Sequence, residues 1–131
     1  MKLTDEEEMS WWAYRQCLEG NDTEEMRSLI TTSEWAFCYC LYIRDIKEMW
    51  SNITCSKWAR WYCQNVKDRE EMWTKINNSG WAYYYCRYVK DRKEIWSKIT
   101  DSYYAYRYCQ NVKDRLEVRK LWDKRFKKEQ R

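Results

Sequence analysis

The feature that most constrains the fold is a 23-residue repeat that runs through the chain without an insertion. Five residue types return at this spacing in five copies, and each set forms one column of the repeat. The columns are Ser10, Ser33, Ser56, Ser79 and Ser102; Ala13, Ala36, Ala59, Ala82 and Ala105; Cys17, Cys40, Cys63, Cys86 and Cys109; Asp22, Asp45, Asp68, Asp91 and Asp114; and Glu25, Glu48, Glu71, Glu94 and Glu117. A period between 20 and 50 residues is typical of repeat architectures, in which each unit packs on its neighbours.

The apolar spacing within one unit predicts two short helices. In the third copy the first helix would begin with Ser56 as its N-cap, since a serine oxygen can accept from an unpaired backbone N–H. Its buried face would carry the residues at positions i, i+3, i+4 and i+7, which are Ala59, Tyr62, Cys63 and Val66.

A second helix is predicted after a tight turn. Residues 68–71 match a capping box, with Asp68 as the N-cap and Glu71 reaching back to it. Four residues that follow, Arg69, Met72, Trp73 and Ile76, would share one face of this helix. Helices this short are marginal alone and gain stability from packing on neighbours.

We therefore predict an all-α fold, an α-solenoid of five tandem 23-residue helix-turn-helix repeats. The predicted organisation is a single domain over residues 1–131, with an N-terminal cap at 1–9, repeats at 10–32, 33–55, 56–78, 79–101 and 102–124, and a basic tail at 125–131. Residues 4–7 match a second capping box, and Gly20 with Asn21 is expected to end the first helix.

This pattern of Ala, Tyr, a small residue, an aliphatic residue and Asp-x-x-Glu resembles a family of uncharacterised tandem helical repeats of about this length in bacterial and viral proteins. The resemblance covers all five units. It consists of packing and capping positions, so it implies a fold and no active site. Where that family has two small residues this chain has Tyr-Cys, and where the family has aliphatic residues this chain has Trp.

The cysteine column is predicted to be buried as small, polarizable apolar side chains. Zinc ligands are grouped closely and often include His, whereas this chain has no His and its closest pair is Cys38 and Cys40. Residues two apart on a helix point away from each other, so this pair is not expected to share a metal. We expect reduced thiols, no metal and no cofactor, with Cys38 and Cys55 the more exposed cysteines.

A candidate partner-binding surface is predicted where the copies differ while the scaffold stays fixed. On the outer face of the first helices these positions carry large aromatic residues and arginines, the residue types that dominate protein-interface hot spots. The predicted contact residues are Tyr42, Trp61, Tyr84, Arg87, Tyr88 and Arg107. The alternatives are that this face only meets solvent or that it packs against a second copy of the chain.

A nucleic-acid surface is the alternative, because some helical repeats read one RNA base per unit. Its candidate residues come from the repeated Lys-Asp-Arg turn: Lys67, Arg69, Lys90, Arg92, Lys113 and Arg115. Acidic residues stand beside these cations, and the net charge of +4 is small for a dedicated nucleic-acid binder. Head-to-tail self-association into a homodimer also remains open, since the chain begins acidic and residues 113–131 are basic.

The function expected from these features is a non-catalytic, protein-binding scaffold that occludes or recruits a partner protein. There is no His for base chemistry, no glycine-rich phosphate loop and no H-E-x-x-H motif, so we do not expect an enzyme. A phage-encoded inhibitor of a host defence system is the narrower expectation, on size and style alone. The acidic start and the absence of a long apolar run predict a cytoplasmic protein with no membrane partner.

Overall fold

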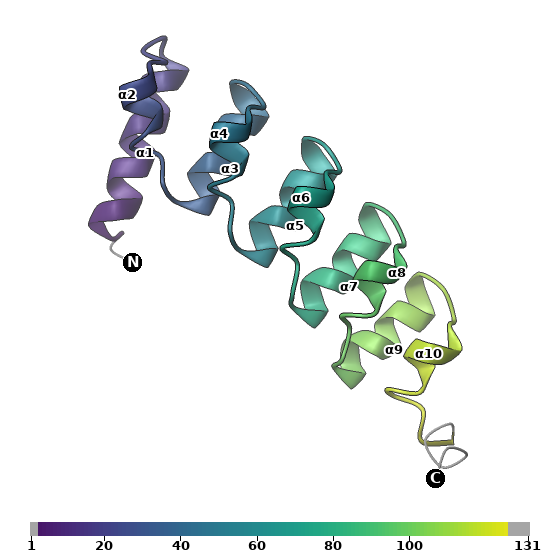
Figure 1. Ribbon diagram of the computed structural model, residues 1–131. Coiled ribbons are helices and arrows are strands. Elements are labelled where there is room, and N and C mark those ends of the chain that lie inside the picture. The colour runs from purple at the N-terminus through teal and green to yellow at the C-terminus, as the bar shows by residue number, and fades with distance from the viewer. Residues whose placement is uncertain (1–2, 126–131) are drawn as a thin grey trace.

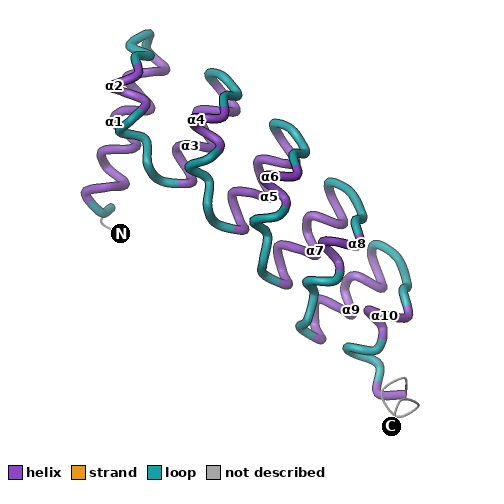
Figure 2. The backbone as a smooth tube through the Cα atoms, viewed as in Figure 1, coloured by secondary structure: helices purple, strands orange, loops and turns teal. Residues whose placement is uncertain are grey.

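The computed structural model describes residues 3–125, which form ten helices arranged as five pairs (Figure 1). The first helices of the pairs are α1 (Asp5–Leu18), α3 (Ser33–Tyr42), α5 (Ser56–Asn65), α7 (Ser79–Tyr88) and α9 (Ser102–Asn111). The second helices are single turns: α2 (Glu24–Arg27), α4 (Lys47–Trp50), α6 (Glu70–Trp73), α8 (Lys93–Trp96) and α10 (Leu116–Arg119). The turns within the pairs all lie along one edge of the molecule (Figure 2).

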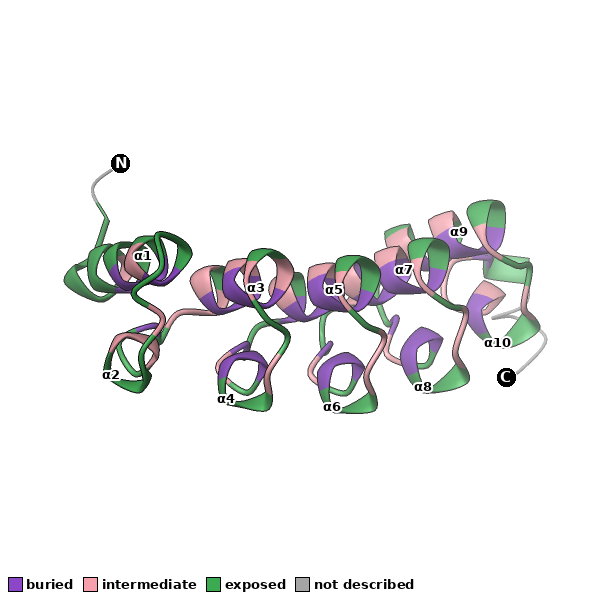
Figure 3. Cartoon of the chain, turned by 90° about the horizontal axis from the view of Figure 1, so that it is seen from above, coloured by how far each residue is buried: buried purple, intermediate pink, exposed green. Residues whose placement is uncertain are grey.

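The pairs stack in sequence order into two layers (Figure 3). The odd-numbered helices form what we call the first-helix layer, in which each helix contacts the next, and the even-numbered helices form the second-helix layer. This arrangement confirms the predicted all-α solenoid with a 23-residue period. Residues 1–2 of the predicted cap and residues 126–131 of the predicted basic tail lie outside the described residues.

The core is a repeated set of buried columns that runs the length of the stack. The alanine column is fully buried, which lets neighbouring first helices approach closely. Beside it lie fully buried tyrosines and isoleucines, namely Tyr39, Tyr62, Tyr85 and Tyr108 and, at the end of the second helices, Ile30, Ile53 and Ile76. The predicted core face is thus confirmed for Ala59, Tyr62 and Cys63, whereas Val66 is half-buried and caps the C-terminus of α5.

Two of the predicted capping roles are wrong, because those side chains bind backbone or side chains far away in sequence. Ser56 is the first residue of α5 rather than its N-cap, and its Oγ accepts from the backbone N–H of Asn77, 2.9 Å away. The N-cap of α6 is Arg69, and no side chain caps that helix. By contrast, Thr4 and Glu7 form the predicted capping box, and Gly20, at φ 112°, ends α1 as expected.

Asp68 instead belongs to a clamp that joins the third repeat to the fourth. The hydroxyl of Tyr85 donates to Asp68 Oδ1 at 2.7 Å, and Arg92 donates to the Tyr85 oxygen at 2.7 Å and to Asp68 Oδ2 at 2.8 Å. The Arg92 guanidinium also lies over the ring of Trp73, 5.0 Å from its centroid. The same Tyr–Asp–Arg clamp recurs in two further junctions, as Tyr62–Asp45–Arg69 and Tyr108–Asp91–Arg115.

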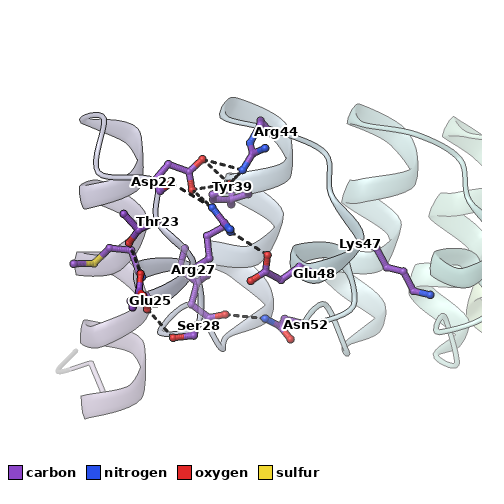
Figure 4. Close-up of polar contacts among 12 residues, drawn as sticks. Asp22, Thr23, Glu25, Arg27, Ser28, Tyr39, Arg44, Lys47, Glu48 and Asn52 are labelled. Carbon is purple, nitrogen blue, oxygen red and sulfur yellow. Dashed lines mark hydrogen bonds and ion pairs between the residues drawn. The ribbon is translucent and has the colours of Figure 1, made fainter.

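The junction between the first and second repeats makes a similar clamp, in which the arginine stands at the tryptophan position of the later clamps and an apolar residue stands at their arginine position (Figure 4). Tyr39 donates to Asp22, but Ile46 stands where later repeats have the clamp arginine. The cation comes instead from Arg27, which stands where later repeats have the clamp tryptophan and binds Asp22 at 3.1 Å. Arg44 adds a second ion pair to Asp22 at 3.3 Å. The carboxylate is therefore neutralised at this junction by a different route.

In the third, fourth and fifth repeats the column cysteine contacts the backbone of the turn inside the repeat. Cys63, Cys86 and Cys109 each place Sγ 4.0 Å from the carbonyl oxygen of the arginine that precedes the second helix. Burial raises the pKa of Cys40, Cys63 and Cys86 to about 12, with a nearby aspartate adding to the effect. These thiols therefore stay protonated near neutral pH, and only Cys55 among the seven is exposed.

Replacing Tyr85 by Phe removes the hydroxyl at the centre of one clamp and keeps the ring. We expect the free energy of unfolding to fall by about 1–2 kcal/mol, since the lost hydrogen bonds involve charged partners. Urea denaturation measures this change. Tyr106→Phe, at a half-exposed tyrosine outside the clamps, is the control, and equal stability of both variants with the wild type would contradict a role of the clamp in joining repeats.

The clamps also predict instability in alkali. Burial, reinforced by the hydrogen bond to aspartate, raises the pKa of Tyr62, Tyr85 and Tyr108 well above the ordinary value of 10.0. In the unfolded chain these tyrosines ionise near that value, so their contribution is fully present below it and is lost as the pH rises further. Tyrosinate absorbance should therefore rise in two steps, the second coinciding with loss of helical circular dichroism. A single step with the helix intact would contradict this expectation.

Thiol chemistry should distinguish Cys55 from the buried column. In the folded protein, Ellman's reagent should react rapidly with one thiol per chain, and the column cysteines should react only after unfolding. Cys55→Ser should remove the rapid phase. Rapid reaction of several thiols in that variant would show that the repeats open locally.

Candidate functional site

The candidate site is a pocket in the first-helix layer, between the third and fourth repeats. It has a volume of about 460 Å³ and is lined by Arg60, Trp61 and Gln64 from α5 and by Trp81, Tyr84 and Tyr88 from α7. Three of the predicted contact residues, Trp61, Tyr84 and Tyr88, therefore lie together. The rings continue across α7 without a gap, since the Tyr84 centroid lies 6.3 Å from that of Tyr88 and 5.7 Å from that of Trp81.

Arg60 lies among the rings of this pocket. Its guanidinium carbon is 4.1 Å from the ring centroid of Trp61 and between 5.4 and 5.9 Å from those of Tyr88, Tyr84 and Trp81. Arg60 is only 5% exposed, and its buried Nε has no hydrogen-bond partner. Burial lowers the pKa of Arg60, but a guanidinium remains charged at neutral pH. The pocket thus holds a positive charge.

The other predicted contact residues extend the surface on either side or lie apart from it. Arg87 lies over the ring of Tyr88 and donates to the hydroxyl of Tyr83 at 2.9 Å, and Arg107 of α9 lies over the ring of Tyr83. Tyr42, at the end of α3, is 66% exposed and does not line the pocket. The structure therefore brings five of the six predicted residues into one region and leaves Tyr42 outside it.

Charge is distributed unevenly along the first-helix layer. Helix α1 begins with four consecutive acidic residues, and α3 carries Glu34. The sequences of α5, α7 and α9 contain no Asp or Glu, but they carry the cations Lys57, Arg60, Arg87 and Arg107. We call the outer side of α5, α7 and α9 the basic aromatic face. It combines positive charge with partly exposed rings and has no acidic residue of its own helices to neutralise it.

Two residues of the pocket, Arg60 and Trp81, are not among the predicted contact residues. A signal for Arg60 was present, because the same position carries an aromatic residue in the other four copies: Tyr14, Phe37, Tyr83 and Tyr106. Arg60 is thus the one charge in an otherwise aromatic column. Gly80 was also overlooked. A Cβ at Gly80 would lie 3.0 Å from the Tyr104 ring, so glycine lets that ring pack against α7.

The predicted nucleic-acid residues separate into two groups. Arg69, Arg92 and Arg115 are held in the clamps, each paired with an aspartate of the preceding repeat. Lys67, Lys90 and Lys113 are exposed on the turns within the pairs, along the edge visible in Figure 2. Half of the proposed phosphate-binding charge is therefore already neutralised inside the protein.

A second pocket, of about 560 Å³, lies at the N-terminal end of the stack and is lined by Leu3, Glu8, Trp11, Trp12 and Trp35. Trp12 corresponds to Trp35 and Trp58, which pack on Tyr14 and Phe37 of the preceding repeat. Among residues 3–125, no helix pair precedes α1, and the ring of Trp12 is half-exposed.

Within residues 3–125, no cluster of three or more Cys, Asp or Glu side chains could hold a metal ion. In the same part of the chain, no helix combines the length and apolar character needed to cross a membrane. A comparison with protein-family models, curated proteins and solved structures finds no match. The geometry itself defines the class, an α-helical solenoid of helix pairs that repeat every 23 residues.

Proposed function

We propose that this solenoid is a non-catalytic scaffold that uses its basic aromatic face to bind an acidic segment of a partner protein. The observation that carries the proposal is the combination of partly exposed rings and unneutralised positive charge on α5, α7 and α9. Aromatic and arginine side chains on a rigid surface are the residues that most often dominate protein interfaces.

The rigidity of the surface supports this role. The clamps and buried columns fix the spacing of α5, α7 and α9, so little order has to be gained on binding. The pocket supplies rings, a guanidinium and an amide but no carboxylate, imidazole or thiol, so the proposed action is occlusion or recruitment. Inhibition of a host defence protein by a phage-encoded chain is the narrower form of this proposal. It rests on size and on the resemblance to bacterial and viral repeats, and on no residue of the surface.

Single-stranded nucleic acid is the second candidate, because tyrosines and arginines that lie side by side on α7 and α9 could stack on bases. Backbone binding requires a row of free cations, and the clamp arginines are paired. The remaining candidate residues, Lys67, Lys90 and Lys113, lie on the turns rather than on the basic aromatic face. We therefore place this candidate second.

A site-specific photocrosslinker tests the proposal in lysate of the source cells. Placed at Tyr88, which is 49% exposed, it should yield an adduct with one protein that survives nuclease treatment. Placed at Leu116 of α10, which is 51% exposed in the other layer, it should yield none. Trp61→Ala should weaken binding of that protein about tenfold or more without unfolding the solenoid.

Two results would contradict the proposal. The first is equal labelling from Tyr88 and Leu116, which would show non-specific contact. The second is an adduct that nuclease removes and whose binding weakens steeply with salt, which would identify nucleic acid as the ligand.

A further inference from the structure

Arg60 is an exception to a packing rule of this solenoid. In the first, second and fourth repeats, an aromatic residue at this position packs on the aromatic residue immediately before the alanine of the next repeat. The ring centroids lie 5.3 Å apart for Tyr14 and Trp35, 5.4 Å for Phe37 and Trp58, and 6.0 Å for Tyr83 and Tyr104. In the third repeat the guanidinium of Arg60 takes that place against Trp81. A fifth aromatic residue would fit the column, so packing alone does not require arginine.

The charge of Arg60 has no counterpart among the described residues. Elsewhere the chain pairs its half-buried arginines with aspartate, as at Arg69, Arg92 and Arg115. Arg60 makes no hydrogen bond or ion pair in the described part of the chain, and neither α5 nor α7 contains an acid. A buried, unpaired charge is unfavourable, and the surrounding rings offset this only in part. The guanidinium is thus available to an anion from outside.

The pocket around Arg60 favours a carboxylate over a phosphate polymer. It offers one guanidinium, whose planar set of donors matches a carboxylate, while its other lining groups are four rings and one amide. The rings of Tyr84 and Tyr88 can pack on the apolar part of an acidic side chain or on its neighbours. A phosphate backbone would instead require several cations in a row.

We infer that the pocket between α5 and α7 is a subsite for one aspartate or glutamate side chain of the partner protein, which would form a charge-assisted hydrogen bond with Arg60. This inference rests on the proposed function, because it names the group that the basic aromatic face recognises. In this inference Arg60 binds the carboxylate, and the four rings shape the pocket and exclude water from it. The helices of the basic aromatic face carry cations and no acidic residue, so their charge is complementary to that of an acidic side chain.

The test uses peptides selected from a displayed random library on the full chain. Selected peptides should share an Asp or Glu next to apolar or aromatic residues. Changing that acid to its amide should weaken binding about tenfold or more, as should Arg60→Phe. The two changes combined should weaken binding by much less than the product of the single effects, because both remove the same contact. Fluorescence anisotropy of labelled peptides measures the dissociation constants.

Two variants separate recognition from folding. Arg60→Phe gives the third repeat the residue that the second already has at Phe37, so its melting temperature should equal or exceed that of the wild type. Lys93→Gln removes one exposed charge from α8 and should leave peptide affinity unchanged. A lower melting temperature of Arg60→Phe with unchanged peptide affinity would make Arg60 a structural residue and would overturn the inference.

The remaining outcomes distinguish this inference from the proposed function. Acid-free peptides that bind through Tyr88 but ignore Arg60→Phe would overturn the carboxylate subsite and leave the protein-binding face standing. Failure to enrich any peptide over a Trp61→Ala, Tyr88→Ala control would overturn both. Arg60-dependent binding of a single-stranded oligonucleotide, or Arg60-dependent self-association in sedimentation, would replace the partner protein with nucleic acid or with a second copy.

Discussion

The hydrogen-bonded clamp of Tyr, Asp and Arg is the interaction on which the rest of the architecture depends. Each second helix is a single turn, which cannot hold its shape alone. The clamp ties the start of that turn to the preceding repeat, since the arginine precedes the helix and its aspartate partner lies 24 residues earlier. Because the three junctions after the first use the same three groups at the same spacing, the stack keeps one geometry from the second to the fifth repeat. The face formed by α5, α7 and α9 inherits its rigidity from these junctions.

The first junction shows that the clamp requires a neutralised carboxylate rather than a particular residue at each position. There, Arg27 and Ile46 take the positions held by tryptophan and arginine at later junctions, and Asp22 still receives both a hydroxyl and a guanidinium. Burial alone would raise the pKa of Asp22, but hydrogen bonds from Tyr39 and Arg27 hold it below its ordinary value. The exchange is compensated because both residues changed together. A residue that differs between copies can therefore leave an interaction intact when a second residue changes with it. Such a difference indicates a binding site only where no second residue compensates for it.

Periodicity predicted the helix pairs, the stack and the buried Ala, Tyr and Cys columns, because the residues on a buried helical face recur in the sequence at the helical period. The role of Asp68 could not be read in the same way. An aspartate three residues before a glutamate satisfies the local rule for a capping box, and only the structure shows that its carboxylate reaches Tyr85 and Arg92 instead. Variation between copies predicted Trp61, Tyr84 and Tyr88, whose rings do converge, but it also included Tyr42, since distance across the stack is not encoded in one repeat. Arg60 was not predicted, because it lies between the buried face and the outer face of α5 that the spacing singled out.

The clamps also determine which charges remain available to a partner. They neutralise Asp45, Asp68 and Asp91 together with three arginines along the turn edge. The uneven charge of the first-helix layer is therefore the main source of the electrostatic field at the basic aromatic face. That field is negative at α1 and positive over α5, α7 and α9. An acidic segment approaching the stack would be repelled from the N-terminal end and attracted to the other, which steers encounter before any contact forms. Arg60 lies at the boundary between these two regions, in the third repeat. A carboxylate bound there would fix the register of the segment, and the rings of α7 and α9 would receive the residues that follow.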